Sequence, residues 1–347
     1  MNTSDGTNDP QVSRALFDNI VANLNGLSVD EIRERLRPLT RGMTVEAPLL
    51  LPGTFLYRAR KVDGTFNKYA GIRLADLSYP PKDRVRLGRL NRDGYPMFYC
   101  SAGKESLFFE LANLQVSDEI IVSIWQATCE EYLNSIGYTS ATFARLGAKR
   151  MCPKWDRKDG EQAQVSLPSL PEAEVVKLLA KDENAVVREL LSEYFSHYID
   201  QYNGRLYKLT TAIGELHHQG TLNNTKRLAG VIYPSVRMWA NADNIALLPW
   251  YVDDHLVFRK AIHYRIDKRE DEVFSITSLD CARQVGHGGE LNWLGRPLSW
   301  TLGPGKRARF TLTAGQDADG DYEIASSGEV VHWVAIDHAT GEVIEPA

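Results

Sequence analysis

The sequence predicts a mixed α+β protein with a substantial buried core. Of its 347 residues 43% are hydrophobic, enough for one large domain or two ordinary ones. Residues 184–199 repeat apolar side chains at the spacing of a helix, whereas residues 119–127 are dense in β-branched side chains, as is typical of a buried strand. Residues 281–347 are rich in glycine, threonine and alternating apolar residues, which indicates further β-structure.

Charge and cysteine usage exclude several classes of protein. The net charge of -5 gives no broad attraction for nucleic acid or an anionic membrane, so neither is expected as a partner. No run of about 18 apolar residues occurs, so no membrane-spanning helix is expected. The first ten residues lack the basic and apolar regions of a secretory signal, and the four cysteines lack CxxC spacing. We therefore predict a cytoplasmic protein with reduced thiols and neither a disulfide framework nor a zinc site.

Residues 1–48 are predicted to form a helical N-terminal extension. Residues 11–27 carry apolar side chains at helical spacing, and Ser28 with Glu31 has the arrangement of a capping box before a second short helix. Packing against the rest of the protein is the simpler interpretation of this extension. A docking surface for a partner is the alternative.

The next segments predict the order strand, loop, strand, helix, strand. Residues 54–61 alternate in the manner of a strand, and a second extended piece is expected at 69–74. Pro80 and Pro81 interrupt the chain before the central stretch. Residues 119–127, after a turn, form a strong candidate for a buried strand.

We expect the chemistry in the central stretch, residues 88–114. It has a turn at Asp93–Gly94, a short apolar run at 96–100 and a helix from Lys104. Glu110 lies inside this helix among large apolar residues, and burying a charge without a partner is costly. Its carboxylate therefore either lies on the solvent-exposed side of the helix or is held in place for a functional role. Its candidate partners are Arg58, Arg60, Arg89 and Arg92.

Residues 139–220 are predicted to be mainly helical. A polar connector at 154–169 precedes three helices, at 172–180, 184–199 and 206–217. Adjacent His217 and His218 point to different sides of a helix, so they do not predict a shared metal.

The chain then returns to β-structure. Residues 228–236 indicate a strand broken at Pro234, followed by a loop at 241–249 that leads into a short apolar run. Two strands, at 255–266 and 272–279, are expected around a solvated charged turn at 267–271.

Three pieces of the chain, taken together and in this order, resemble the RES-domain family, which is named for an arginine, a glutamate and a serine. They are the LYRAR segment, the central stretch 88–114 and the segment 230–249. The resemblance covers roughly residues 50–260. The residues that carry it are Arg58, Gly88, Arg89, Asn91, Pro96, Tyr99, Glu110 and Ser235.

The resemblance implies an ADP-ribosyltransferase-like mixed sheet with flanking helices, and NAD+ consumed as a substrate with no permanently bound cofactor and no metal. Residues 49–260 would form the NAD-binding catalytic domain, with a helical insertion at about 139–220, and 261–347 a β-rich C-terminal extension. Reactions reported for the family are hydrolysis of NAD+, its phosphorolysis, and ADP-ribosyl transfer to a protein. Some members are toxins of toxin–antitoxin systems, so a protein antitoxin is one implied partner and a protein acceptor another.

Cleavage of the nicotinamide–ribose bond suits the residue types of this set. A neutral pyridine leaves a cationic nucleotide through an oxocarbenium-like transition state, which a carboxylate stabilises. Glu110 is the candidate carboxylate, and the resemblance adds Arg58 and Tyr99 as catalytic residues.

The remaining roles concern binding of the dinucleotide. Arg58 and Arg89 offer planar forks for the pyrophosphate. Tyr99 is a candidate for stacking on nicotinamide or orienting a ribose, and Asn91 for ordering the loop or contacting the ligand. Ser235 follows a proline at a strand end, where its hydroxyl would be presented to a cleft.

Simpler interpretations stay open beside this one. Taken singly, an arginine on a strand is usually a surface residue, Tyr99 a core residue, Glu110 a solvated helix residue and Ser235 a turn residue. The alternatives to an NAD+-degrading enzyme are a mono-ADP-ribosyltransferase and a non-enzymatic RES-like protein that binds a partner. A kinase, a dehydrogenase and a serine hydrolase lack support, because the sequence has no Walker loop, no strand-linked G-x-G-x-x-G and no G-x-S-x-G.

Overall fold

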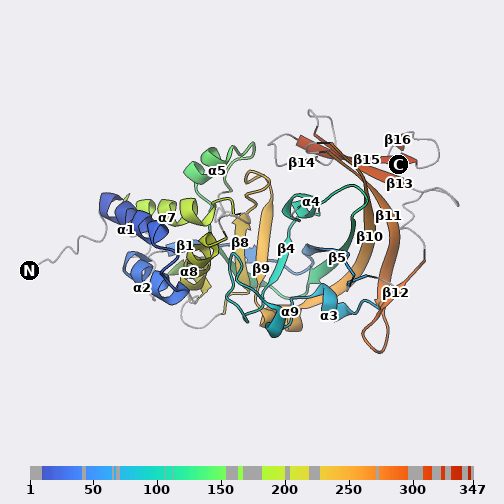
Figure 1. The fold of residues 1–347 in the computed structure, drawn as a ribbon, viewed down its shortest axis with the longest axis horizontal. Helices are drawn as coiled ribbons and strands as arrows, with labels where there is room; N and C mark the ends of the chain where they lie inside the picture. The colour runs from blue at the N-terminus through green and yellow to red at the C-terminus, as the bar shows by residue number, and fades with distance from the viewer. Residues whose placement is uncertain are drawn as a thin grey trace, which may run out of the picture.

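A curved sheet and a group of helices at one end of it make up the computed structural model (Figure 1). Helices α1, α2, α7 and α8 gather at one end, and the long strands β10 and β11 lie at the other. None of the helices in the described part of the chain is both long and apolar enough to cross a membrane. The structure describes residues 10–40, 44–64, 66–67, 71–104, 106–111, 113–153, 163–166, 182–199, 204–218, 227–270, 273–295, 308–314, 322–324, 330–337 and 343–344.

The helices fall where the helical spacing and the caps predict most of them. The helices that begin at Pro10, Val29, Ser106, Asp182 and Leu206 lie in segments that the sequence predicts to be helical. The helix bounds are α1 Pro10–Ala22, α2 Val29–Thr40, α3 Leu74–Leu77, α4 Ser106–Glu110, α5 Ser140–Leu146, α7 Asp182–Phe195, α8 Leu206–His218 and α9 Pro249–His255, with a 3-10 turn at Lys82–Arg84.

The described strands form one sheet of 14 and one pair, β1 with β7. The large sheet runs β14-β15-β13-β11-β10-β5-β3-β4-β9-β8-β6-β2, with β12 on β11 and β16 on β15, and its only parallel pair among these is β6 with β8. The strands are β1 Thr44–Ala47, β2 Leu49–Leu50, β3 Phe55–Lys61, β4 Phe98–Ser101, β5 Glu119–Ala127, β6 Glu131–Ser135, β7 Ala163–Ser166, β8 Gly230–Pro234, β9 Asp243–Leu247, β10 Leu256–Glu270, β11 Val273–Val285, β12 Leu291–Trp293, β13 Ala308–Ala314, β14 Tyr322–Ile324, β15 Val330–Asp337 and β16 Val343–Ile344.

The predicted α+β class is confirmed, and so is the order of β3, β4, α4 and β5. Strand β5 has the predicted bounds, because its β-branched residues are buried against both faces of the sheet. Strand β10 pairs with β5 along nine residues, so the C-terminal strands continue the same sheet. The expected domain boundary between residues 260 and 261 therefore falls inside β10.

Several local predictions were wrong in part. A charged turn was expected at 267–271, but strand β10 continues as far as Glu270. Its backbone N–H and C=O groups are hydrogen-bonded to β11 there. The loop expected at 241–249 contains strand β9, and the polar connector at 154–169 contains β7, which pairs with β1. Of the extended piece predicted at 69–74, the structure describes residues 71–74, in which Arg73 forms an isolated bridge with Glu290. The helix predicted at 172–180 lies outside the described residues.

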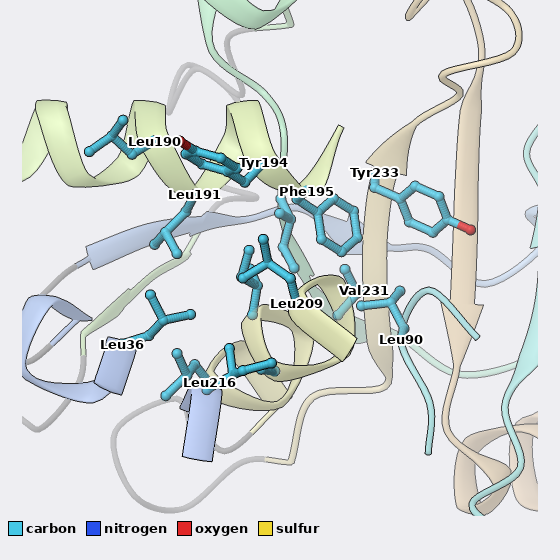
Figure 2. Close-up of a cluster of buried hydrophobic side chains, with 14 of the residues drawn as sticks. Leu36, Leu90, Leu190, Leu191, Tyr194, Phe195, Leu209, Leu216, Val231 and Tyr233 are labelled. Atoms are coloured by element: carbon cyan, nitrogen blue, oxygen red, sulfur yellow. The ribbon is translucent and has the colours of Figure 1, made fainter. Parts of the chain in front are cut away.

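Helices α1, α2, α7 and α8 cover one face of the sheet through a large apolar cluster. Figure 2 shows Leu36 of α2, Leu191 of α7, Leu209 of α8 and Val231 of β8 as members of this cluster. Strand β8 approaches β9 so closely that a Cβ on Gly230 would lie 2.1 Å from the Ala246 oxygen, so only glycine fits there. The opposite face packs on a second cluster that includes Phe98, Trp125 and Ile245.

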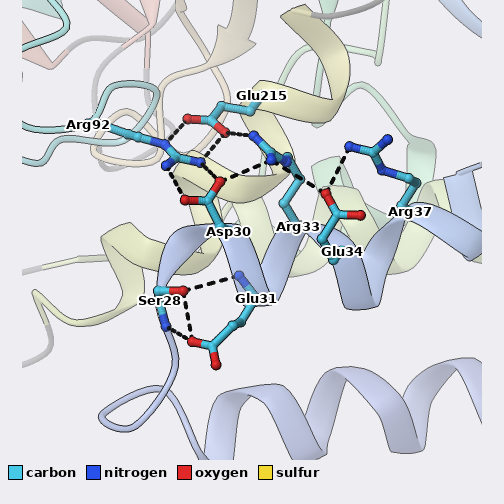
Figure 3. Close-up of polar contacts among 8 residues, drawn as sticks. All are labelled: Ser28, Asp30, Glu31, Arg33, Glu34, Arg37, Arg92 and Glu215. Atoms are coloured by element: carbon cyan, nitrogen blue, oxygen red, sulfur yellow. Dashed lines mark hydrogen bonds and ion pairs between the residues drawn. The ribbon is translucent and has the colours of Figure 1, made fainter.

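The N-terminal extension is tied to the body of the protein by polar contacts as well (Figure 3). The capping box is confirmed: the Ser28 amide and hydroxyl donate to Glu31 Oε2, and the Glu31 amide donates to Ser28 Oγ. Arg92 donates to Asp30 on α2 and to Glu215 on α8, and hydrogen bonds to these carboxylates raise its pKa. Arg92 therefore links helices, and its candidacy as a partner of Glu110 was wrong.

A buried histidine makes the stability of this layer depend on pH. His217, at the end of α8, is 4% exposed, its Nδ1 lies 2.8 Å from the Ile213 oxygen, and burial lowers its pKa from 6.5 to about 4. Between these values the unfolded chain binds a proton that the folded protein does not, so stability falls as the pH falls. We expect a loss of roughly 3 kcal/mol between pH 6.5 and 4 from this residue alone.

Urea unfolding measured from pH 4.5 to 7.5 tests this expectation. His217→Gln should flatten the dependence of the unfolding free energy on pH. His287→Gln, at an exposed turn, is the matched control and should keep the slope of the parent. Equal slopes in parent and His217→Gln would contradict the prediction.

Candidate functional site

A cavity of about 320 Å³ lies where strands β4, β8 and β9 meet the chain that follows α7. We call it the Glu110 cavity. It brings together three residues expected from the sequence, Arg89, Tyr99 and Glu110. Its described lining residues are Gly88, Arg89, Tyr99, Glu110, Tyr198, Ile199, Tyr207, Tyr233, Val236, Arg237 and Asn244.

Strand register explains why these side chains share one face of the sheet. Asn244 of β9 lies opposite Ser101 of β4 and opposite Tyr233 of β8. Directly opposed residues of antiparallel strands point to the same face, and so does Tyr99, two residues before Ser101. The helical layer covers this face, so the cavity lies between the sheet and the helices.

Glu110 is the last residue of α4 and is held by two hydrogen bonds. Ser235 Oγ and Asn244 Nδ2 both donate to its Oε1, the second over 2.7 Å. Among the described residues no donor pairs with its Oε2, and no arginine forms an ion pair with it. The arginine partners expected for Glu110 were thus wrong, and its carboxylate is oriented by neutral donors on β9 and after β8.

Ser235 is fully buried and organises the turn that follows β8. Its amide donates to the Ala242 oxygen over 2.8 Å, and its Oγ accepts from the Met238 amide over 3.1 Å. Trp239 and Ala240 then take left-handed backbone angles, with φ of 49° and 60°. Such angles are uncommon for these residues and persist only where the surrounding contacts enforce them. Ser235 therefore reaches the cavity only through Glu110.

Tyr99 and Asn91 form a second fixed group at the cavity. Tyr99 donates its hydroxyl hydrogen to Asn91 Oδ1 over 2.8 Å and accepts from the Leu90 amide, and burial raises its pKa. Asn91, which is 7% exposed, also donates to the Arg86 and Arg92 oxygens. Asn91 thus orders the loop behind Tyr99 and does not line the cavity.

Arg89 lines the cavity, but its donors are partly used. It donates to the main-chain oxygens of Phe195 and His197, and its guanidinium lies 5.6 Å from the centre of the Phe195 ring. These bonds join the central stretch to the end of α7. A guanidinium has five N–H donors, so these two bonds do not use all of them.

The structure does not bring Arg58 to this cavity. Tyr57 of β3 is paired with Ser101, so its side chain points to the face of the sheet that carries the cavity. Arg58 is the next residue along β3, so its side chain points to the other face. There its guanidinium lies 5.5 Å from the centre of the Phe98 ring and donates to the Tyr99 oxygen over 2.8 Å. Burial lowers the pKa of Arg58 to about 10, so it remains charged at neutral pH and supports β4 from behind.

Sequence reasoning did not single out several lining residues. Asn244 and Arg237 lie in the segment 230–249, which carries part of the family resemblance, but neither belongs to its pattern. Tyr198 and Tyr207 flank the connection between α7 and α8, and only the packing of these helices brings them to the sheet. Burial holds the pKa of Tyr233 well above its ordinary value, helped by nearby Tyr99 and Glu110, so its phenol is neutral.

No group of three or more potential metal ligands occurs among the residues that the structure describes. Comparison of the chain with protein-family models, curated proteins and solved structures finds no match. The relation to the RES-domain family therefore stays a prediction from the three sequence segments.

Proposed function

We propose that this protein cleaves NAD+ at the nicotinamide–ribose bond, and that the Glu110 cavity is its active site. The observation that carries the proposal is the carboxylate of Glu110, fixed by Ser235 and Asn244 in a cavity walled by tyrosines and two arginines. The RES-like segments support it, and an ADP-ribosyltransferase-like arrangement of the central sheet is part of the same proposal.

The geometry suits this reaction because the carboxylate is oriented before the ligand binds. When the bond between the ribose C1′ and the pyridine nitrogen breaks, its electron pair leaves with nicotinamide and the sugar becomes cationic. Glu110 Oε2 offers a negative charge to that cation, while Oε1 stays bonded to Ser235 and Asn244. Water or phosphate then bonds to C1′, and with water a proton is released.

The remaining residues of the cavity bind NAD+ and orient it. Tyr99, Tyr207 and Tyr233 provide flat faces for nicotinamide, and Tyr207 and Tyr233 provide hydroxyls for the ribose. Arg89 and Arg237 offer charge for the pyrophosphate. Arg58 acts indirectly, since its bond to the Tyr99 oxygen holds β4 in place.

A nicotinamide-release assay tests the proposal. Purified protein incubated with NAD+ should release nicotinamide, and runs with and without inorganic phosphate separate hydrolysis from phosphorolysis by their products. Labelled NAD+ in a cell lysate separates both from ADP-ribosyl transfer, which would leave label on a protein. Folded protein that releases no nicotinamide in any of these conditions would overturn the proposal and favour a non-enzymatic binding role.

A further inference from the structure

A second cavity, of about 340 Å³, adjoins the first and is not used by the chemistry above. We call it the Trp239 cavity. The two cavities share Tyr198, Val236 and Arg237 as lining residues. Helix α4 lies between them, because Glu110 lines the first cavity and the preceding Phe108 and Phe109 line the second.

The Trp239 cavity is aromatic and positively charged. Trp239 is 46% exposed, whereas Phe274 on β11 is buried and meets Phe109 edge to face with 5.5 Å between ring centres. The charged lining residues are Arg237 and Arg269, and none of the described lining residues is acidic. A ligand with a flat ring and a negative charge fits this combination.

The two arginines are placed to meet phosphate groups. Arg237 lines both cavities, lies 5.1 Å from the centre of the Tyr198 ring and has no carboxylate partner among the described residues. Arg269 donates one Nη1 bond to the Leu114 oxygen and lies 5.3 Å from the centre of the Phe274 ring. Among the described residues this is its one side-chain hydrogen bond, so other guanidinium donors of Arg269 are left for a ligand.

The orientation of a dinucleotide follows from the charges. Glu110 favours the cationic nicotinamide riboside end in the first cavity and disfavours phosphate there. The pyrophosphate would then lie at Arg237, where the cavities join, and the other nucleoside would enter the second cavity.

We propose that the Trp239 cavity binds the adenosine phosphate end of the dinucleotide, with the purine against Trp239 and the phosphate near Arg237 and Arg269. This inference rests on the proposed function. It also assigns a ligand-binding role to Arg269 and Phe274, which lie in β10 and β11, outside the part of the chain that carries the family resemblance.

Calorimetric binding of AMP tests the inference without any turnover. Trp239→Ala and Arg269→Gln should each raise the Kd for AMP by about tenfold, as expected for the loss of a stacked ring or a phosphate contact. Trp239→Phe keeps an aromatic face and should stay close to the parent. Nicotinamide mononucleotide, which would occupy the Glu110 cavity, should bind all three variants as it binds the parent.

Two exposed residues supply matched controls, with circular dichroism to verify the fold of every variant. Tyr95→Ala removes a side chain that is 68% exposed, and Arg35→Gln a charge on the outer surface of α2, so both should leave the Kd for AMP unchanged. No AMP binding by the parent, or unchanged affinity in both Trp239→Ala and Arg269→Gln, would overturn the inference. AMP binding with the expected losses but no nicotinamide release would keep the nucleotide site and remove only the proposed reaction.

Discussion

Glu110→Gln is expected to slow nicotinamide release by about 10²–10³-fold, the range found when one preorganised electrostatic group is removed from an active site. The amide keeps the Oε1 acceptor for Ser235 and Asn244, so the side chain should stay in place. What it loses is the negative charge that stabilises the cationic sugar. Initial rates at saturating NAD+ measure the effect on the chemical step.

The control for this prediction is Glu34→Gln, which removes one negative charge from the exposed surface of α2. It should release nicotinamide at the parent rate. Equal unfolding midpoints of parent and Glu110→Gln would show that the fold is intact. A Glu110→Gln protein as active as the parent would exclude the carboxylate from the mechanism.

Phe17→Ala should lower the free energy of unfolding by about 3–5 kcal/mol, the usual loss for a fully buried phenylalanine. Phe17 of α1 has no exposed surface and stacks on Tyr194 of α7 with 4.8 Å between ring centres. Its removal leaves a cavity in the cluster that joins the N-terminal helices to the sheet. Urea unfolding, followed by tryptophan fluorescence, measures the loss.

Val12→Ala, on the same helix but 53% exposed, is the matched control and should change the unfolding free energy by no more than about 0.5 kcal/mol. The pair separates the two interpretations of the N-terminal extension. If α1 were only a docking surface, Phe17→Ala would leave the main unfolding transition where it is in the parent.

Short-range patterns were enough for several of the elements. Strand β5 and helices α2 and α8 follow from β-branched density, a capping box and helical spacing, which are properties of neighbouring residues. Strand β9 was missed, because one of its partners, β4, is distant in the sequence. The same holds for β7, which pairs with β1. The end of β10 was missed although its partner β11 is the next strand along the chain, because its charged residues resemble a solvated turn until the hairpin satisfies their backbone.

The candidate site also has a part that could be predicted from neighbouring residues and a part that depends on the tertiary structure. The sequence by itself determined that Arg89, Tyr99 and Glu110 lie on one loop–strand–helix segment, and the structure places all three at one cavity. Only the tertiary structure decided that Ser235 and Asn244 hold Glu110, and that Arg58 lies on the far face of the sheet. The physical reason is register: the pairing of β3, β4, β9 and β8 fixes which alternate side chains share a face, and that pairing depends on contacts across the whole fold.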